Sequence, residues 1–110
     1  MRFNNPQYPY MVDRDINIFD LLNTIQENKT MPVVVVNKDQ SIYGILSKGD
    51  LIDYISSHPK KNILNAKVED IANKFPIVGH EDDSLETIQK YLEPENIKLL
   101  PILDNKRKVI

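Results

Sequence analysis

The chain has 110 residues, of which 41% are hydrophobic and 27% are charged, and its formal net charge is −2 with a pI near 5.6. This length suits one ordinary domain or two small repeats with a shared core, and the composition is globular rather than disordered. The slightly acidic charge gives no general attraction to nucleic acid or anionic lipid, and the lack of cysteine excludes disulfides and cysteine-bound zinc.

The first dozen residues contain two prolines and are expected to be an irregular lead-in that ends near Val12. Apolar residues at helical spacing predict a helix over residues 18–28, and Asn17 is well placed to cap it. The run Val33–Val36 is too short for a helix and apolar on both faces, which is typical of a buried strand. It is also the longest apolar stretch, far below the roughly 20 residues of a membrane span, so we expect a cytoplasmic protein without membrane contact.

The next segments have the pattern of a hairpin followed by a helix. A polar turn at residues 37–40 leads to a second strand at residues 42–46, which should pair back on the first. Ser47 is expected to cap a helix that ends before Pro59. Residues 60–66 form a polar connector and are the best candidate for a boundary between two halves.

The second half gives shorter signals of the same kind. In chain order, we expect a short helix at 68–72, a short strand at 76–78, a helix at 85–92, a strand at 99–103, a turn at 104–107 and the start of a partner strand at 108–110.

The two halves align without a gap at an offset of 67 residues, which predicts an internal repeat. Ile18 aligns with Leu85, and the apolar positions of the predicted strands align as well. The position that would match Gly44 is the one after Ile110, so the second unit is expected to stop inside a strand. Because half a strand leaves ladder groups unpaired, we infer an excised fragment of a longer protein.

The segment Gly44–Leu51 carries the chemistry of the sequence. It places a serine at the end of a strand and an aspartate in the first turn of a helix, where free amides and the helix dipole favour an anion. Gly49 would let a ligand approach the backbone, and ionised Asp50 has only acceptors, which suit two ribose hydroxyls. The same Ser-x-x-Asp pattern is that of a capping box, so the segment taken alone favours a structural helix start over a ligand site.

The order of elements, with Val-Val-Val-Asn, then Ile-x-Gly-Ile-Leu-Ser-x-x-Asp-Leu and a partial copy with Leu-Pro-Ile-Leu-Asp, resembles tandem cystathionine-β-synthase-type (CBS) repeats. The resemblance implies an α/β fold, a CBS-domain pair of two β-α-β-β-α units related by a pseudo-twofold axis, the second unit incomplete at its C-terminus. Residues 1–9 would precede the pair, with the first repeat at residues 10–59 and the second at residues 67–110. Such pairs have two clefts between the repeats.

The resemblance also implies a ligand, an adenosine nucleotide such as AMP, ADP, ATP or S-adenosylmethionine, held in one cleft as a regulator. Ser47 and Asp50 would hold phosphate and ribose, and the second repeat would enclose the adenine. The residues assigned to this cleft are Ile45, Ser47, Gly49, Asp50, Ile77, Ile97, Lys98 and Leu99. Those assigned to the base pocket of the second cleft, which would lack its own serine and aspartate, are Tyr10, Thr30 and Met31.

By this resemblance the chain is a non-catalytic module that controls an attached enzyme or transporter domain and requires no cofactor. One alternative is a ligand-free module that forms a homodimer through its helices. Another is the N-terminal part of a sugar-phosphate nucleotidyltransferase, because Ser-Lys-Gly-Asp resembles the Thr-Asp-Gly-Asp of CBS pairs that precede such enzymes. We expect no catalytic residues, since no nucleophile–base pair converges, and no metal site, since His58 and His80 are isolated.

Overall fold

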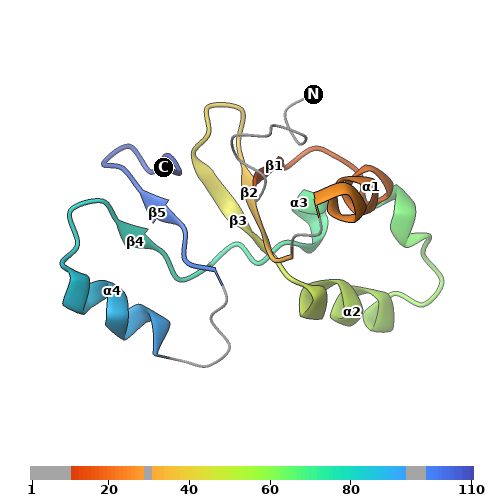
Figure 1. Cartoon of the computed structure of the whole chain (residues 1–110). Coiled ribbons are helices and arrows are strands. Elements are labelled where there is room, and N and C mark those ends of the chain that lie inside the picture. Colours follow the sequence, from red (N-terminus) through yellow and green to blue (C-terminus); the bar gives the residue numbers. More distant parts are fainter. Residues whose placement is uncertain (1–10, 29–30, 94–98) are drawn as a thin grey trace.

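The structure is a computed structural model that describes residues 11–28, 31–93 and 99–110, with the side chains of residues 26–28 left aside. Two units lie next to each other and are joined by a connector (Figure 1). The first unit contains β1 (Met11–Asp13), α1 (Ile18–Asn28), β2 (Val33–Val36), β3 (Ile42–Leu46) and α2 (Lys48–Ser57). In the structure the connector between the units is the longer segment of residues 58–78, which carries the 3₁₀ turn η2 (Ile63–Asn65) and α3 (Val68–Ile71). The second unit contains β4 (Gly79–His80), α4 (Leu85–Leu92) and β5 (Ile102–Leu103).

The first unit is built on a three-stranded sheet of order β1-β2-β3. β1 and β2 are parallel and joined through α1, whereas β2 and β3 form the predicted antiparallel hairpin. Side chains of β2 alternate between its two faces, and all four valines are buried. Val33 and Val35 face the helices, and Val34 and Val36 face the second unit. The prediction of a strand buried on both faces is therefore confirmed.

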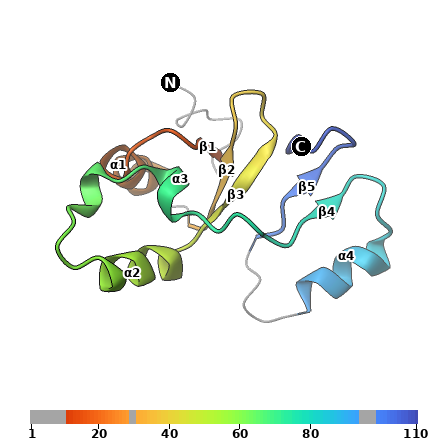
Figure 2. The same ribbon diagram turned by 180° about the vertical axis from the view of Figure 1, so that it is seen from behind.

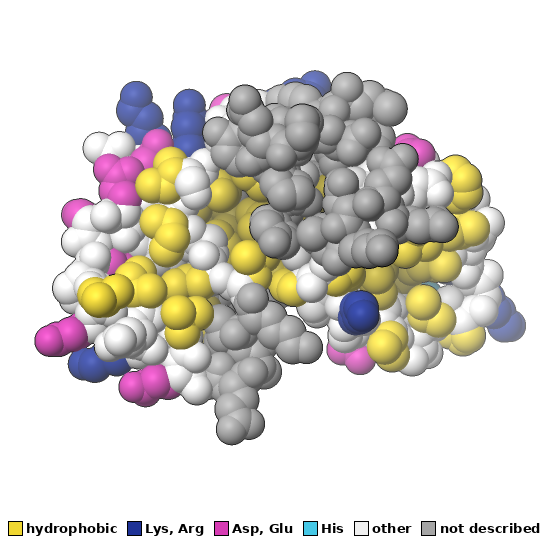
Figure 3. All heavy atoms as spheres, viewed as in Figure 1, with side chains coloured by type: hydrophobic (Ala, Val, Ile, Leu, Met, Phe, Trp, Pro, Cys, Tyr) yellow, Lys and Arg dark blue, Asp and Glu magenta, His cyan; other side chains and the backbone are white. Residues whose placement is uncertain are grey.

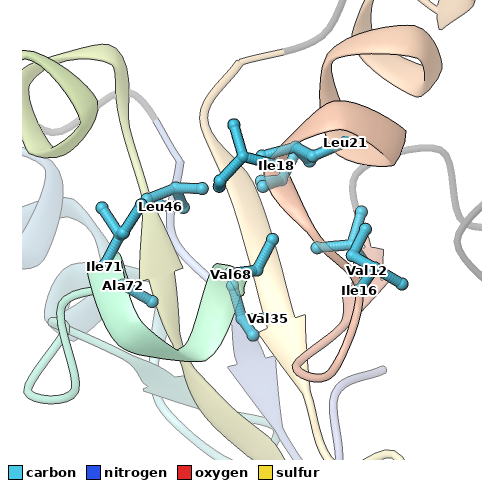
Figure 4. Close-up of a cluster of buried hydrophobic side chains, with 10 residues drawn as sticks. Val12, Ile16, Ile18, Leu21, Val35, Leu46, Val68, Ile71 and Ala72 are labelled. Atoms are coloured by element: carbon cyan, nitrogen blue, oxygen red, sulfur yellow. The ribbon is translucent and has the colours of Figure 1, made fainter. Parts of the chain in front are cut away.

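The main hydrophobic core lies between this sheet and the helices (Figure 4). Ile18 and Leu21 of α1 and Val68 of α3 are essentially inaccessible to solvent and pack on the inner face of the sheet. The amide of Ile18 also donates to the carbonyl of Ala66 at 2.9 Å, so the connector is fixed across the start of α1. The connector thus completes the core of the first unit.

The internal repeat predicted from the sequence is confirmed by the register of the strands. In the first unit Val12 is paired with Val35, and in the second Gly79 is paired with Ile102, in the same parallel sense. The two pairs are related by the 67-residue offset of the sequence alignment. The β1–α1–β2 and β4–α4–β5 segments are therefore copies of one unit.

The two hairpin turns are also copies, and they pair with each other. Gln40 and Arg107 are 67 residues apart and both have a positive φ, 73° and 64°. The amide of Ile42 donates to the carbonyl of Arg107 at 3.0 Å, and the amide of Val109 donates to the carbonyl of Gln40 at 3.1 Å. The two hydrogen bonds are equivalent, because Ile42 aligns with Val109 and Gln40 aligns with Arg107. The repeats are consequently related by a pseudo-twofold axis that passes between the turns.

A second, smaller core lies at this axis and joins the repeats. Val36 and Ile42 of the first repeat contact Leu103 and Val109 of the second, their own counterparts in the alignment. All four are buried, and Leu103 is completely inaccessible. The exposure of the two copies of the helix differs, however, because Ile18 is 1% exposed and its counterpart Leu85 is 75% exposed.

Several strands differ from those predicted from the apolar pattern of the sequence. β1 was not predicted from periodicity, although the family resemblance implied a strand there. The predicted strand at 76–78 is wrong, because β4 lies at Gly79–His80; Pro76 has no amide hydrogen, and the register with β5 fixes the pairing beyond it. β5 is shorter than predicted, and in the last segment Val109 makes only an isolated bridge to Leu103.

Clear pKa shifts within the described part of the chain occur at two carboxylates in the hairpin turns. The hydroxyl and the amide of Ser41 donate to Asp39 and lower the pKa of that carboxyl below its ordinary value. The amides of Lys108 and Lys106 donate to Asp104 and lower its pKa in the same way. Both carboxylates therefore stabilise turns. None of the described helices is long and apolar enough to cross a membrane.

Candidate functional site

A cleft of about 680 Å³ lies where the first repeat meets the second, within the size range of small-molecule sites. The first repeat contributes the start of β2, the end of β3 and the first turn of α2. The connector and the segment before β4 form the opposite wall together with Leu99. The lining residues are Met31, Pro32, Ile45, Ser47, Lys48, Gly49, Asp50, Asn73, Phe75, Pro76, Ile77 and Leu99.

Strand pairing brings these segments together. Val33 is opposite Leu46 in the hairpin, so Pro32 lies beside Ser47 at the same end of the sheet. On the other edge of β3, the amide of Ile45 donates to the carbonyl of Asn73 at 3.0 Å, and the amide of Asn73 donates back to Ile45 at 2.8 Å. This pair holds the connector against the strand and directs the following residues along the cleft.

The close approach of the connector explains Gly44. A Cβ atom at this position would overlap the carbonyl oxygen of Asn73 and approach its carbonyl carbon to 3.0 Å. Only glycine leaves room for the connector to cross the strand here. Gly44 is thus a packing requirement of the wall of the cleft.

The first turn of α2 forms the polar end of the cleft, and its capping box is present as predicted. The amide and the hydroxyl of Ser47 donate to Asp50 Oδ2 at 2.9 and 3.0 Å, and the amide of Asp50 donates to Ser47 Oγ at 3.2 Å. The Ser-x-x-Asp motif therefore caps the helix, as its structural interpretation predicted. The cap uses Oδ2 of Asp50 and leaves the other carboxylate oxygen, Oδ1, unexplained.

Three polar groups of this turn remain available to a ligand. The amides of Lys48 and Gly49 have no partner within the helix, because the first turn cannot provide one. Asp50 Oδ1 makes no hydrogen bond to the part of the chain that the structure describes. A Cβ atom at Gly49 would meet only Ser47 Oγ, at 3.7 Å, so the fold itself does not require glycine there. Two donors and one acceptor thus belong to residues that line the cleft.

The opposite wall is apolar and well exposed. Ile77 is 45% exposed, and Phe75 is 90% exposed although it borders the cleft. Leu99 is half-buried and also packs on the small core between the repeats. A ligand in this cleft would contact polar groups on one side and apolar side chains on the other.

Most of the residues assigned to this cleft from the sequence line it in the structure. These are Ile45, Ser47, Gly49, Asp50, Ile77 and Leu99. The remaining two, Ile97 and Lys98, lie outside the described residues, as do Tyr10 and Thr30 of the second cleft.

Met31 differs from the assignment made from the sequence, because it lines this cleft, whereas the sequence analysis assigned it to the second one. It lies immediately before Pro32, which the hairpin register places beside Ser47. Pro32 and Leu99 are counterparts in the two repeats, and both line the same cleft. Residues this close to the pseudo-twofold axis cannot be assigned to one cleft from the sequence.

The sequence analysis missed the contribution of the connector, namely Asn73, Phe75 and Pro76. A signal was present in the repeat alignment, where Phe75-Pro76 coincides with Tyr8-Pro9. An aromatic residue followed by proline at the same position of both repeats distinguishes this segment from an ordinary linker.

Neither histidine is among the residues that line the cleft. His58 caps the end of α2 and stacks on Tyr54 with ring centroids 4.2 Å apart, and His80 is exposed on β4. Within the described ranges, no group of three or more His, Asp or Glu side chains is placed to hold a metal ion.

Comparison with known proteins agrees with this architecture. Residues 7–57 match the family model of the CBS domain. The chain is 25% identical over 132 aligned residues to an uncharacterised protein of Methanocaldococcus jannaschii, with 93% of this chain and 79% of that protein covered.

Two solved structures share the fold. CBSX2 in complex with AMP superposes with a TM-score of 0.76 at 22% identity, covering 96% of this chain and 80% of that one. The cytosolic domain of the Mg²⁺ channel MgtE in complex with ATP superposes with a TM-score of 0.76 at 19% identity, covering 96% of this chain and 41% of that one. The two repeats, related by a pseudo-twofold axis, thus have the fold of a CBS-domain pair.

Proposed function

Because residues 7–57 match the CBS-domain model and the chain has the fold of a CBS-domain pair, we propose that it binds an adenosine nucleotide in the cleft and thereby regulates an attached protein. The observation that carries the proposal is the cleft itself, in which the first turn of α2 is opposite apolar residues of the second repeat. Related structures that hold AMP and ATP support this ligand class.

The phosphate would lie at the start of α2. The free amides of Lys48 and Gly49 lie at the positive end of the helix dipole, where an anion is stabilised. Lys48 is exposed and borders the cleft, so its ammonium group adds positive charge nearby. The absence of a side chain at Gly49 leaves space for phosphate oxygens to reach the backbone.

The ribose would be bound by Asp50. Its Oδ2 atom is held by the backbone and hydroxyl of Ser47, which fixes the carboxylate in orientation, and Oδ1 is left as an acceptor. Two neighbouring hydroxyls of a ribose can donate to such a carboxylate. The base would then extend toward Ile77 and Leu99.

Regulation follows if the ligand binds one arrangement of the repeats more tightly than another, since equal affinity would shift no equilibrium. The cleft is suited to this because its polar end belongs to the first repeat and Ile77 and Leu99 belong to the second. A nucleotide would therefore bridge the two. The chain would act without catalysis of its own.

Isothermal titration calorimetry with AMP, ADP, ATP and S-adenosylmethionine tests the proposal directly. We expect at least one to bind with a dissociation constant below 1 mM, which corresponds to about −4 kcal/mol. A 2′-deoxyribose analogue of that ligand should bind more weakly, because it lacks one donor to Asp50. The absence of binding by all four ligands at millimolar concentration would overturn the proposal.

Association into a homodimer is a second candidate function, supported by exposed apolar side chains on two helices. Phe19 and Leu22 of α1 are 53% and 42% exposed, and Ile52 and Ile55 of α2 are 62% and 49% exposed. Both helices lie at the end of the molecule away from the second repeat, as the front and rear views show (Figures 1 and 2). Apolar side chains reach the surface at this end of the space-filling view (Figure 3).

Sedimentation velocity tests this second candidate. A dimer that forms without nucleotide and dissociates in Ile52→Glu would support it, because a buried charge opposes association. Leu85→Glu on α4, at the other end of the molecule, is the matched control and should leave the dimer intact. If the wild-type chain stays monomeric as its concentration is raised from roughly 1 to 100 µM, association into a homodimer is excluded as a function.

The attached protein stays a prediction from the sequence. The Ser-Lys-Gly-Asp segment suggests a sugar-phosphate nucleotidyltransferase, and an assay of the natively expressed protein for nucleotidyl transfer to a sugar phosphate would test it. Transfer activity that responds to the bound nucleotide would support this assignment, whereas its absence would leave a different enzyme or a transporter as the regulated partner.

A further inference from the structure

Phe75 is held at the edge of the cleft with its aromatic ring in solvent. It is 90% exposed, the most exposed of the large apolar residues that the structure describes. Phenylalanine is among the residues most often buried, so this degree of exposure in a residue that borders a cleft requires an explanation.

The backbone around Phe75 is fixed rather than free. Its amide donates to the side-chain oxygen of Asn73 at 3.0 Å, and Asn73 is itself paired with Ile45 by two hydrogen bonds. Pro76 follows and restricts the other side. The ring is therefore carried on a segment whose position relative to the cleft is set by β3.

The repeat supplies an independent observation. Tyr8 occupies the position of Phe75 in the first repeat and is also followed by proline. The exposed apolar residues of α1 are not kept in this way, since Phe19 aligns with Glu86 and Leu22 with Gln89. The position of Phe75 is thus aromatic in both repeats, whereas these two exposed positions of α1 are polar in the second repeat.

We propose that Phe75 is the lid of the nucleotide cleft and stacks on the base of the bound ligand. This inference rests on the proposed function and deepens it, because it assigns a residue that selects ligands with a planar aromatic base. The ring lies on the same wall as Ile77, toward which the base would extend from Asp50. Stacking on the base would remove the exposed ring from solvent, which favours binding of a ligand with a planar aromatic base.

Calorimetry with AMP and ribose 5-phosphate distinguishes base stacking from phosphate and ribose contacts. Phe75→Ala should weaken AMP binding by about fivefold to about 150-fold, the range seen when a stacked aromatic side chain is truncated. The affinity for ribose 5-phosphate, which has no base, should be unchanged. Phe75→Leu should restore only part of the AMP affinity, and Leu85→Ala, an exposed apolar residue on α4, should change neither.

Phe75→Trp gives a direct signal of contact, because the natural sequence contains no tryptophan. AMP should quench the single tryptophan fluorescence and ribose 5-phosphate should not. Equal AMP affinity of wild type and Phe75→Ala, with weaker binding by Asp50→Asn, would overturn the lid and leave the proposed function intact. Failure of wild type to bind any adenosine ligand would overturn both.

Discussion

Asp50 has two separable roles in this structure, and replacing it by Ala or by Asn should separate them. One carboxylate oxygen, Oδ2, accepts the amide and hydroxyl hydrogens of Ser47 and caps α2. The other oxygen is the proposed acceptor for the ribose. Alanine removes both roles, whereas asparagine retains one side-chain oxygen for the cap and replaces the other by a donor.

The magnitudes of the two effects differ. The loss of the cap in Asp50→Ala should lower the free energy of unfolding by about 1 kcal/mol, and Asp50→Asn should lower it by less. Two hydrogen bonds from ribose hydroxyls to a carboxylate contribute about 1.5 kcal/mol or more each. Both variants should therefore lose at least about 3 kcal/mol of binding free energy, roughly a 150-fold rise in dissociation constant.

Urea denaturation and calorimetry measure the two effects on the same preparations. Asp70→Ala is the matched control, because Asp70 Oδ2 accepts the amide of Lys67 at 3.2 Å and caps α3 outside the cleft. It should lower stability to a similar degree and leave nucleotide affinity unchanged. The reasoning is refuted if Asp50→Asn binds nucleotide as tightly as wild type, since the carboxylate would then serve the helix alone.

Three further predictions concern the two glycines and the core between the repeats. Gly49→Ala should keep the stability of the wild type or raise it by up to about 1 kcal/mol, because the added methyl group meets only Ser47 Oγ. It should weaken nucleotide binding in calorimetry, and an unchanged affinity would contradict the contact between the backbone and the phosphate. Gly44→Ala should cost about 1–3 kcal/mol in urea denaturation through its clash with Asn73, and faster hydrogen exchange at that amide would locate the damage. Leu103→Ala should cost about 2–5 kcal/mol, whereas a thermal unfolding curve like that of wild type would contradict a core shared by the repeats.

The sequence predicted the elements with strong local signals. The Val33–Val36 run could be assigned because four consecutive β-branched residues leave no polar face, and Ser47 could be assigned as a cap because its partner Asp50 lies three residues on. The shortest strands could not be assigned in this way. β4 has only Gly79 and His80, and its position is set by pairing with β5 rather than by its own residues.

The candidate cleft was predicted on the side where the chemistry is local and missed where it depends on packing. The Ser-x-x-Asp turn is contiguous, so its residues could be named together. The connector wall forms only because Gly44 lets Asn73 pair with β3, a contact between residues 29 positions apart that no short pattern records. Met31 lines this cleft, although the sequence analysis assigned it to the second one, because its neighbourhood is set by the pairing of the strands.

The unequal covering of the two copies of the helix has a consequence for how each half can vary. Ile18 is enclosed by the connector, whereas its counterpart Leu85 has most of its surface in solvent. A polar substitution at Ile18 must place that side chain in a closed interior, but the same substitution at Leu85 remains hydrated. The two repeats should therefore differ in mutational tolerance at this position, and the first is the more constrained.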